Sequence, residues 1–201
     1  LSPAVTMVQD LYVKNLKKYF KNKLVLSVPQ WELHGAGATL VLGPNGAGKT
    51  TFLRILAQLL SFDEGEVSIP AGCKRSFYES GFFIFPELTV GEHFSFLRQL
   101  VADDFIEGVA ERFDLPAVWH QPAIELSRGW KARLGLALAC SKQSQLYLFD
   151  EPMDALDKAG SEMLLQELHN LHNSGRTLII ATHRAQSYEA LSPTSYSVGA
   201  R

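Results

Sequence analysis

The segment GPNGAGKT, residues 43–50, has the residue types and spacing of a loop that binds phosphate groups. Its glycines let successive backbone N–H groups turn inward around phosphate oxygens, and a following helix would point its positive end at the same charge. In such a loop Lys49 reaches the β- and γ-phosphates, and the Thr50 hydroxyl is a ligand for Mg²⁺. A glycine-rich turn without a ligand is the alternative, but a strand expected at 39–43 and a helix expected at 50–60 give the loop its context. We therefore predict a phosphate site made by Gly43, Pro44, Asn45, Gly46, Ala47, Gly48, Lys49, Thr50 and Thr51.

The segment LYLFDEP, residues 146–152, supplies carboxylates that suit the same chemistry. A strand ending in Asp150 presents a carboxylate that can hold Mg²⁺, and Glu151 can polarise an attacking water. His183 follows another predicted strand at 177–182, and ligands of parallel sheets bind at the carboxyl ends of strands. A solvated acidic turn and a surface histidine are the alternatives. Together with the phosphate loop, the pattern favours Glu151, His183 and Lys49 as catalytic residues, with Thr50 and Asp150 at the metal.

A second helix start suited to anions lies at ELSRGW, residues 125–130. Ser127 is a good N-cap, and Gly129 in the first turn lets a ligand approach the backbone closely. The residues alone predict only this second anion-binding helix end. They do not say why one chain would need two.

The elements that must position these groups alternate between strands and helices, which indicates an α/β fold. Residues 88–142 contain no convincing strand and are predicted to form a small helical subdomain inserted into one domain that spans residues 1–201. Thr89 and Glu92 form a capping-box pattern at the start of its first helix. The predicted strands are 39–43, 66–69, 74–78, 145–150 and 177–182, with an edge strand at 195–198, and the predicted helices are 50–60, 89–100, 105–113 and 158–172.

The composition is that of an ordinary globular protein, with 201 residues, 46% hydrophobic and 20% charged. A net charge of -2 gives no general attraction to nucleic acid. Cys73 and Cys140 have no metal-ligand spacing and are expected to be reduced thiols. No apolar run is long enough to span a membrane, and the first residues do not resemble a signal peptide. Met7 is a candidate for the natural start.

Taken together, these motifs resemble the nucleotide-binding domain of ABC ATPases, over nearly the whole chain and in the family's order. GPNGAGKT is similar to Walker A, LYLFDEP to Walker B, ELSRGW to the signature loop, DALD (154–157) to the D-loop and ATHR (181–184) to the H-loop. The resemblance implies a P-loop NTPase fold with a mostly parallel sheet, an N-terminal antiparallel β subdomain and an inserted helical subdomain. It also implies that Mg²⁺ and ATP bind, and that two such domains pair head to tail.

In that pairing, the second anion site of one chain would cover the ATP held by the other. The resemblance thus implies that Ser127, Arg128 and Gly129 face the partner's γ-phosphate, with Asp157 in the D-loop. It also places Tyr19 on the adenine, with Phe20 as a competitor. Four residues depart from the family pattern: Glu79 stands where a glutamine is usual and is expected to reach the metal, Arg128 and Trp130 alter the signature, and Asp154 stands where a small serine is common.

The function that the resemblance implies is that of the ATP-hydrolysing subunit of a membrane transporter, with export favoured. Its partners would be a second ATPase domain and a membrane-spanning permease, and it would lie on the cytoplasmic face of the membrane. Apolar residues 82–85 are expected near a groove that receives a helix of the permease, with Phe82 and Phe83 facing it. A soluble ABC-type ATPase acting on ribosomes or DNA is the alternative, and a regulator that does not hydrolyse ATP is a third; no nucleic acid is expected as a partner.

Overall fold

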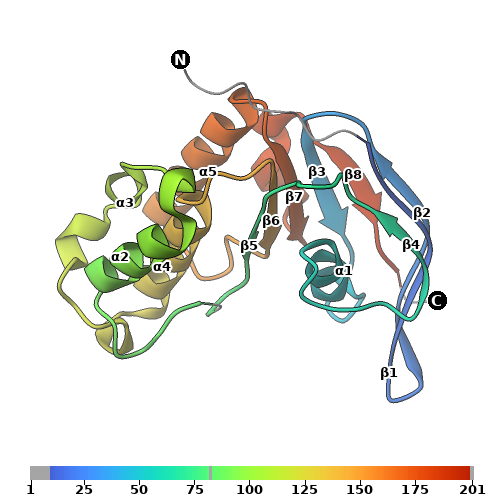
Figure 1. Ribbon diagram of the computed structural model, residues 1–201, viewed down its shortest axis with the longest axis horizontal. Coiled ribbons are helices and arrows are strands. Elements are labelled where there is room, and N and C mark those ends of the chain that lie inside the picture. The colour runs from blue at the N-terminus through green and yellow to red at the C-terminus, as the bar shows by residue number, and fades with distance from the viewer. Residues whose placement is uncertain (1–9, 82, 200–201) are drawn as a thin grey trace.

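The computed structural model describes residues 10–81 and 83–199, and its centre is a five-stranded sheet (Figure 1). The strand order is β5-β6-β7-β3-β8, and every neighbouring pair is parallel. The central strands are buried along their whole length because helices cover both faces of the sheet, which explains their continuous apolar runs. The strands are β3 (Ala38–Leu42), β5 (Arg75–Tyr78), β6 (Leu146–Asp150), β7 (Thr177–Thr182) and β8 (Thr194–Ser197).

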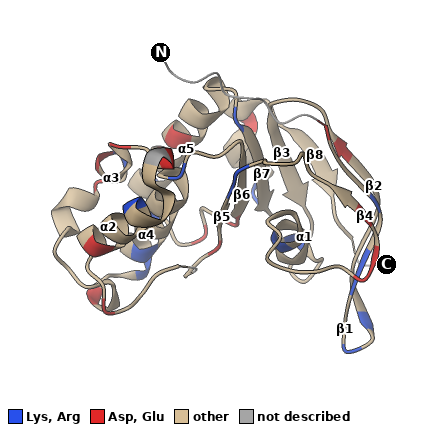
Figure 2. Cartoon of the chain, viewed as in Figure 1, with Lys and Arg blue, Asp and Glu red and all other residues tan. Residues whose placement is uncertain are grey.

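A smaller antiparallel sheet, of order β2-β1-β4, lies beside this core. It consists of β1 (Leu11–Phe20), β2 (Lys23–Leu33) and β4 (Glu64–Ser68), so β4 begins earlier than the strand predicted at 66–69. Basic residues of β1 lie opposite acidic residues of β4 (Figure 2), and Lys17 pairs with Glu64 at 2.8 Å. The other face of this sheet is apolar and packs on helix α1 (Lys49–Leu56), which lies between the two sheets.

The described part of the chain between β5 and β6 forms helices and turns, as predicted for this segment. It contains α2 (Val90–Val101), α3 (Val109–Arg112) and α4 (Arg128–Cys140), with short 3₁₀ turns at Ala102–Asp104, Leu115–Val118 and Ala123–Glu125. Helix α5 (Lys158–Asn173) and a 3₁₀ segment at Ala185–Leu191 follow β6 and β7. None of the helices among the described residues is long and apolar enough to cross a bilayer.

Local sequence signals predict some of the observed helix ends correctly and others wrongly. The capping box at Thr89 is present, with its hydroxyl accepting a hydrogen bond from the Glu92 N–H. The helix predicted at 105–113 is wrong for its first half, because Gly108 has a φ of 74° and α3 starts only after it. The helix predicted at 50–60 ends at Leu56, and Gln58 has a φ of 60°. Apolar spacing alone therefore overestimated both lengths.

Candidate functional site

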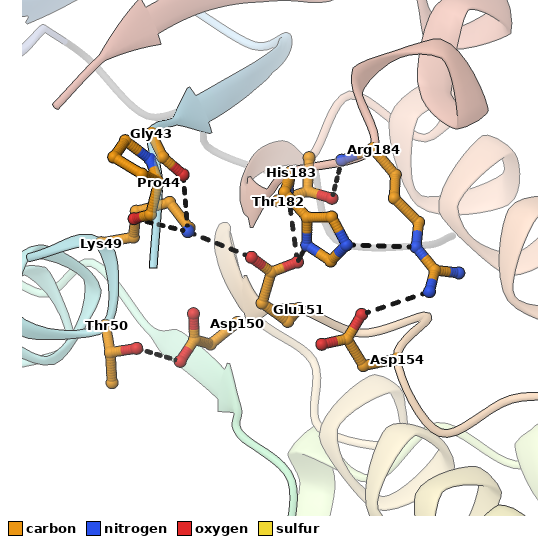
Figure 3. A network of polar contacts seen from close by, with 10 residues as sticks. All are labelled: Gly43, Pro44, Lys49, Thr50, Asp150, Glu151, Asp154, Thr182, His183 and Arg184. Atoms are coloured by element: carbon orange, nitrogen blue, oxygen red, sulfur yellow. Dashed lines mark hydrogen bonds and ion pairs between the residues drawn. The ribbon is translucent and has the colours of Figure 1, made fainter. Parts of the chain in front are cut away.

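The glycine-rich loop joins β3 to α1 at the carboxyl edge of the parallel sheet (Figure 3). Gly48 has a φ of 96°, and a Cβ added there would lie 2.8 Å from the Val25 carbonyl oxygen, so this position needs glycine. Pro44, Asn45 and Gly46 are exposed, whereas Lys49 is buried. The exposed part of the loop can therefore receive a ligand.

The Lys49 ammonium group lies across the mouth of the loop. It donates hydrogen bonds to the carbonyl oxygens of Gly43 at 2.9 Å and Pro44 at 3.4 Å, and forms an ion pair with Glu151 Oε1 at 3.2 Å. If the loop binds phosphate groups as predicted, phosphate oxygens would take the positions of these oxygens. The lysine therefore has an anion-binding position already filled from within the chain.

Thr50 and Asp150 lie together where the sequence placed a metal. The Thr50 hydroxyl donates a hydrogen bond to Asp150 Oδ2 at 2.6 Å, while the buried Oδ1 has no hydrogen-bond partner. Burial raises the pKa of Asp150; the Thr50 bond opposes this shift, and the nearby negative charges of Glu79 and Glu151 add to it. A hydroxyl and a carboxylate with an unused oxygen are the hard ligands that Mg²⁺ prefers, so these residues fit that ion.

Glu151 and His183 are also brought together, by adjacent strands. Asp150 of β6 lies opposite Ala181 of β7 in the parallel ladder, so the residues that follow each strand are neighbours. His183 Nδ1 lies 3.0 Å from Glu151 Oε2, and the same oxygen accepts a hydrogen bond from the His183 backbone N–H at 3.3 Å. Glu151 has a φ of 44°, an unfavourable backbone conformation for a residue with a side chain. Such strain is held in place here by the surrounding contacts.

A second layer of contacts around His183 was not foreseen from the sequence. Arg184 Nε lies 3.4 Å from His183 Nε2, and Arg184 Nη2 lies 3.8 Å from Asp154 Oδ1 (Figure 3). Asp154 was noted only as a departure from a smaller residue. The pair links the turn after β6 to the turn after β7, so it restricts the position of the imidazole between them.

Glu79, predicted at the metal, is held by a residue that the sequence analysis did not single out. Its carboxylate accepts two hydrogen bonds from Arg54 of α1, from Nε at 2.9 Å and from Nη2 at 2.5 Å. Glu79 follows β5 at the same edge of the sheet as Asp150. The sequence signal for this contact was the position of Arg54 one helical turn after Thr50, which places both side chains on the same face of α1.

Ser127, Arg128 and Gly129 are placed apart from this cluster, at the start of α4. Ser127 and Arg128 are exposed, and the Ser127 hydroxyl caps the helix by accepting a hydrogen bond from the Trp130 N–H at 3.3 Å. A Cβ at Gly129 would lie 3.4 Å from the Ala155 carbonyl oxygen, so the helix start packs against the segment after β6. The predicted helix start is thus present and exposed, and its binding of an anion stays a prediction.

Asp157 has its own partners within the chain. It caps α5 by accepting a hydrogen bond from the Gly160 N–H at 2.8 Å, and it pairs with Arg133 of α4 at 2.8 Å. The Arg133 guanidinium also lies over the Trp130 ring, 4.8 Å from its centroid. These contacts fasten the start of α4 to the start of α5, which the sequence reading did not anticipate.

Tyr19 lies near the tip of the β1–β2 hairpin and is half-buried. Its hydroxyl donates to Glu64 at 3.2 Å and its backbone N–H donates to Asp63 at 2.7 Å. It pairs with Leu24 of β2, next to the part of that strand that packs on Gly48. Its role on the adenine stays a prediction, and the placement is compatible with it.

An apolar groove of about 450 Å³ lies between β5, α2 and α4. Phe83 and Phe96 line it with 61% and 43% of their surfaces exposed, and Leu100 on the same rim is 63% exposed. Phe82, expected beside Phe83, lies outside the described residues. The expectation that Phe83 faces a groove is therefore met by its position.

Comparison with known proteins gives this arrangement a family. The model of the ABC transporter family matches residues 26–154. The spermidine/putrescine import ATP-binding protein PotA of Thermotoga maritima is 30% identical over 87% of this chain and 52% of its own length. The cytochrome c biogenesis ATP-binding export protein CcmA of Rhodobacter capsulatus is 37% identical over 74% of this chain and 69% of its own length.

The fold comparison agrees with the sequence comparison. A solved structure described as the ATP-binding subunit of an ABC transporter superimposes with a TM-score of 0.83 at 20% identity, covering 94% of this chain and 85% of that one. The chain spans only 63% of the ABC transporter ATP-binding protein YdbJ of Bacillus subtilis, to which it is 29% identical over 90% of its own length. With its phosphate loop, strand-end carboxylates and histidine at one edge of a parallel sheet, the chain belongs to the ABC transporter family.

Proposed function

We propose that this chain is one ABC ATPase domain, with a helical insertion at about 88–142, that binds and hydrolyses Mg²⁺-ATP as a subunit of a membrane transporter. The observation that carries the proposal is the contact chain Lys49–Glu151–His183 beside the Thr50–Asp150 pair. It joins a phosphate-binding lysine, a candidate base and its orienting histidine to a metal site. The contact between Glu151 and His183 argues against a regulator that does not hydrolyse ATP.

The roles of the residues follow from their contacts. On nucleotide binding, Lys49 exchanges its bonds to Gly43, Pro44 and Glu151 for phosphate oxygens. Glu151 is then free to accept a proton from the attacking water, and His183 holds its other carboxylate oxygen. Thr50 and Asp150 would hold Mg²⁺, which would supply positive charge beside the phosphates.

Remaining nucleotide contacts come from both ends of the site. The loop from Gly43 to Thr51, in which Asn45 and Gly46 are exposed, surrounds the phosphates, and Tyr19 stacks on the adenine. The open helix start at Ser127, Arg128 and Gly129 contacts the γ-phosphate bound by a second domain. The two-domain arrangement explains why an anion-binding helix end lies apart from the phosphate loop in one chain.

Glu151→Gln tests both the base and the pairing. We expect turnover to fall by a factor of about 10²–10⁴, because a general base is removed without loss of volume. We also expect Mg²⁺-ATP to trap a dimer, measured by light scattering on a sizing column. Glu162→Gln, an exposed glutamate of α5, is the matched control. Unchanged turnover in Glu151→Gln would refute the assignment of the base, and a strictly monomeric trapped form would refute the pairing.

The apolar groove is proposed as the docking site for a short helix of the permease, which would hold the subunit at the cytoplasmic face of the membrane. Exposed aromatic side chains around a concave surface suit an amphipathic helix. We expect Phe96→Ser to abolish recovery with the membrane fraction and leave ATP binding unchanged. Ile124→Ser is the control, because Ile124 is 65% exposed and lies outside the groove. Equal membrane recovery of both variants would contradict the docking site.

Export is the direction we favour, because the segment LSRGWKARL (126–134) and Glu79 resemble export-type subunits; relatives of both directions match the chain. Transport assays in vesicles of known orientation, with the permease present, decide the direction. Recovery with ribosomes or DNA in place of membranes would instead support the soluble alternative, for which neither the charge nor the comparisons give support.

A further inference from the structure

Two carboxylates at the ends of adjacent strands are each bound by a residue of helix α1. Tyr78 of β5 lies opposite Phe149 of β6 in the parallel ladder, so Glu79, which follows β5, lies beside Asp150, the last residue of β6. Thr50 holds Asp150, with its hydroxyl 2.6 Å from Oδ2. Arg54, one turn further along the same face of α1, holds Glu79 through two hydrogen bonds.

The negative charges at this edge of the sheet give the contact between Arg54 and Glu79 a role in the electrostatics of the nucleotide site. Glu79, Asp150 and Glu151 are three carboxylates, and Lys49 pairs with only one of them, Glu151. A nucleotide would bring further negative charge to the same place. Among the described residues, the Arg54 guanidinium is the other cation in contact with these three carboxylates. It donates two hydrogen bonds to the Glu79 carboxylate, and such a bidentate pair is stronger than a single hydrogen bond.

We propose that Arg54 is a positioning residue of the nucleotide site: it holds Glu79 beside the Thr50–Asp150 pair and cancels its charge, so that a triphosphate can bind next to this carboxylate. The inference rests on the proposed function, because it presumes that ATP occupies the loop. It assigns a nucleotide-binding effect to a side chain that is 45% exposed and that the sequence analysis did not single out.

A double-mutant cycle tests the inference, with binding of a fluorescent ATP analogue measured in EDTA so that no metal masks the charge. We expect Arg54→Gln to weaken metal-free binding about tenfold, because Glu79 is left unpaired beside the phosphates. In the Glu79→Gln background, the same change should alter affinity less than twofold. Arg54→Lys should recover a large part of the loss, because it restores the charge without the paired geometry.

Saturating Mg²⁺ supplies a second readout. A bound cation neutralises Glu79 in place of Arg54, so the defect of Arg54→Gln should shrink from about tenfold to less than threefold. Arg98→Gln, which breaks an exposed ion pair with Glu107 on α2, is the control and should leave both affinities unchanged.

The outcomes separate this inference from the proposed function. Equal effects of Arg54→Gln with and without Glu79, or with and without Mg²⁺, would overturn the role of Arg54 and leave the ATPase assignment intact. Failure of the wild-type chain to bind the analogue under any condition would instead overturn the proposed function. A fall in Tm for Arg54→Gln with unchanged affinity would show that the pair is only a structural contact between α1 and the loop after β5.

Discussion

An ion pair between α3 and α5, in which a buried carboxylate meets a guanidinium that is 38% exposed, gives a stability prediction whose size follows from its geometry. Arg112 donates two hydrogen bonds to Glu167, at 2.6 Å and 2.9 Å, and the Glu167 side chain is only 2% exposed. Arg112→Met keeps the aliphatic length but leaves the carboxylate buried without its cation. Removing one partner of a buried pair costs about 3–5 kcal/mol. Because Arg112 reaches solvent, and because Asn170 still donates to Glu167 at 3.3 Å, we expect the lower end, about 3 kcal/mol.

Urea unfolding and thermal denaturation measure this loss. For a chain of this size, about 3 kcal/mol corresponds to a fall in Tm of roughly 6–12 °C. The double variant Arg112→Met/Glu167→Met should recover most of the loss, since no buried charge then remains.

Arg98→Met is the matched control, because Arg98 and its partner Glu107 are 62% and 65% exposed. An exposed pair contributes about 0–1 kcal/mol, so this variant should be close to wild type. The reasoning is refuted if both single variants lose equal stability, or if the double variant is no more stable than Arg112→Met.

Two further predictions concern the loop and the start of α5. Gly48→Ala should lose about 2 kcal/mol more in urea unfolding than Gly72→Ala, because both have a positive φ but only the Gly48 methyl meets the Val25 carbonyl; equal losses would contradict the steric argument. The Arg133 ion pair lowers the pKa of Asp157 below its ordinary 3.8, so its contribution to stability is present above that pH and is lost as the pH falls through the folded value. Asp157→Asn should therefore lower Tm near neutral pH and flatten its acid-dependent fall, and parallel curves for variant and wild type would count against this role.

The sequence alone was sufficient to find the groups that are close together because of local chain geometry. A strand followed by a glycine loop and a helix places Lys49 and Thr50 without any distant contact, and Thr89 and Ser127 cap their helices through bonds to residues three positions away. The strand-end position of Asp150 also followed from local patterning. In each case the interaction joins residues that are close in the sequence, so the local order of residue types is enough to predict it.

Only the tertiary structure decided which of these groups have partners from distant segments. Arg54 meets Glu79, Arg133 meets Asp157, and these contacts depend on which strands are adjacent and on how α4 packs against α5. The helix predicted at 105–113 was wrong in its first half for a similar reason. Phe105 forms a β-bridge with the distant Lys142, and the helix begins only at Val109. Pairing between strands and packing between helices depend on how the whole core is buried. No single short segment of the sequence determines that burial.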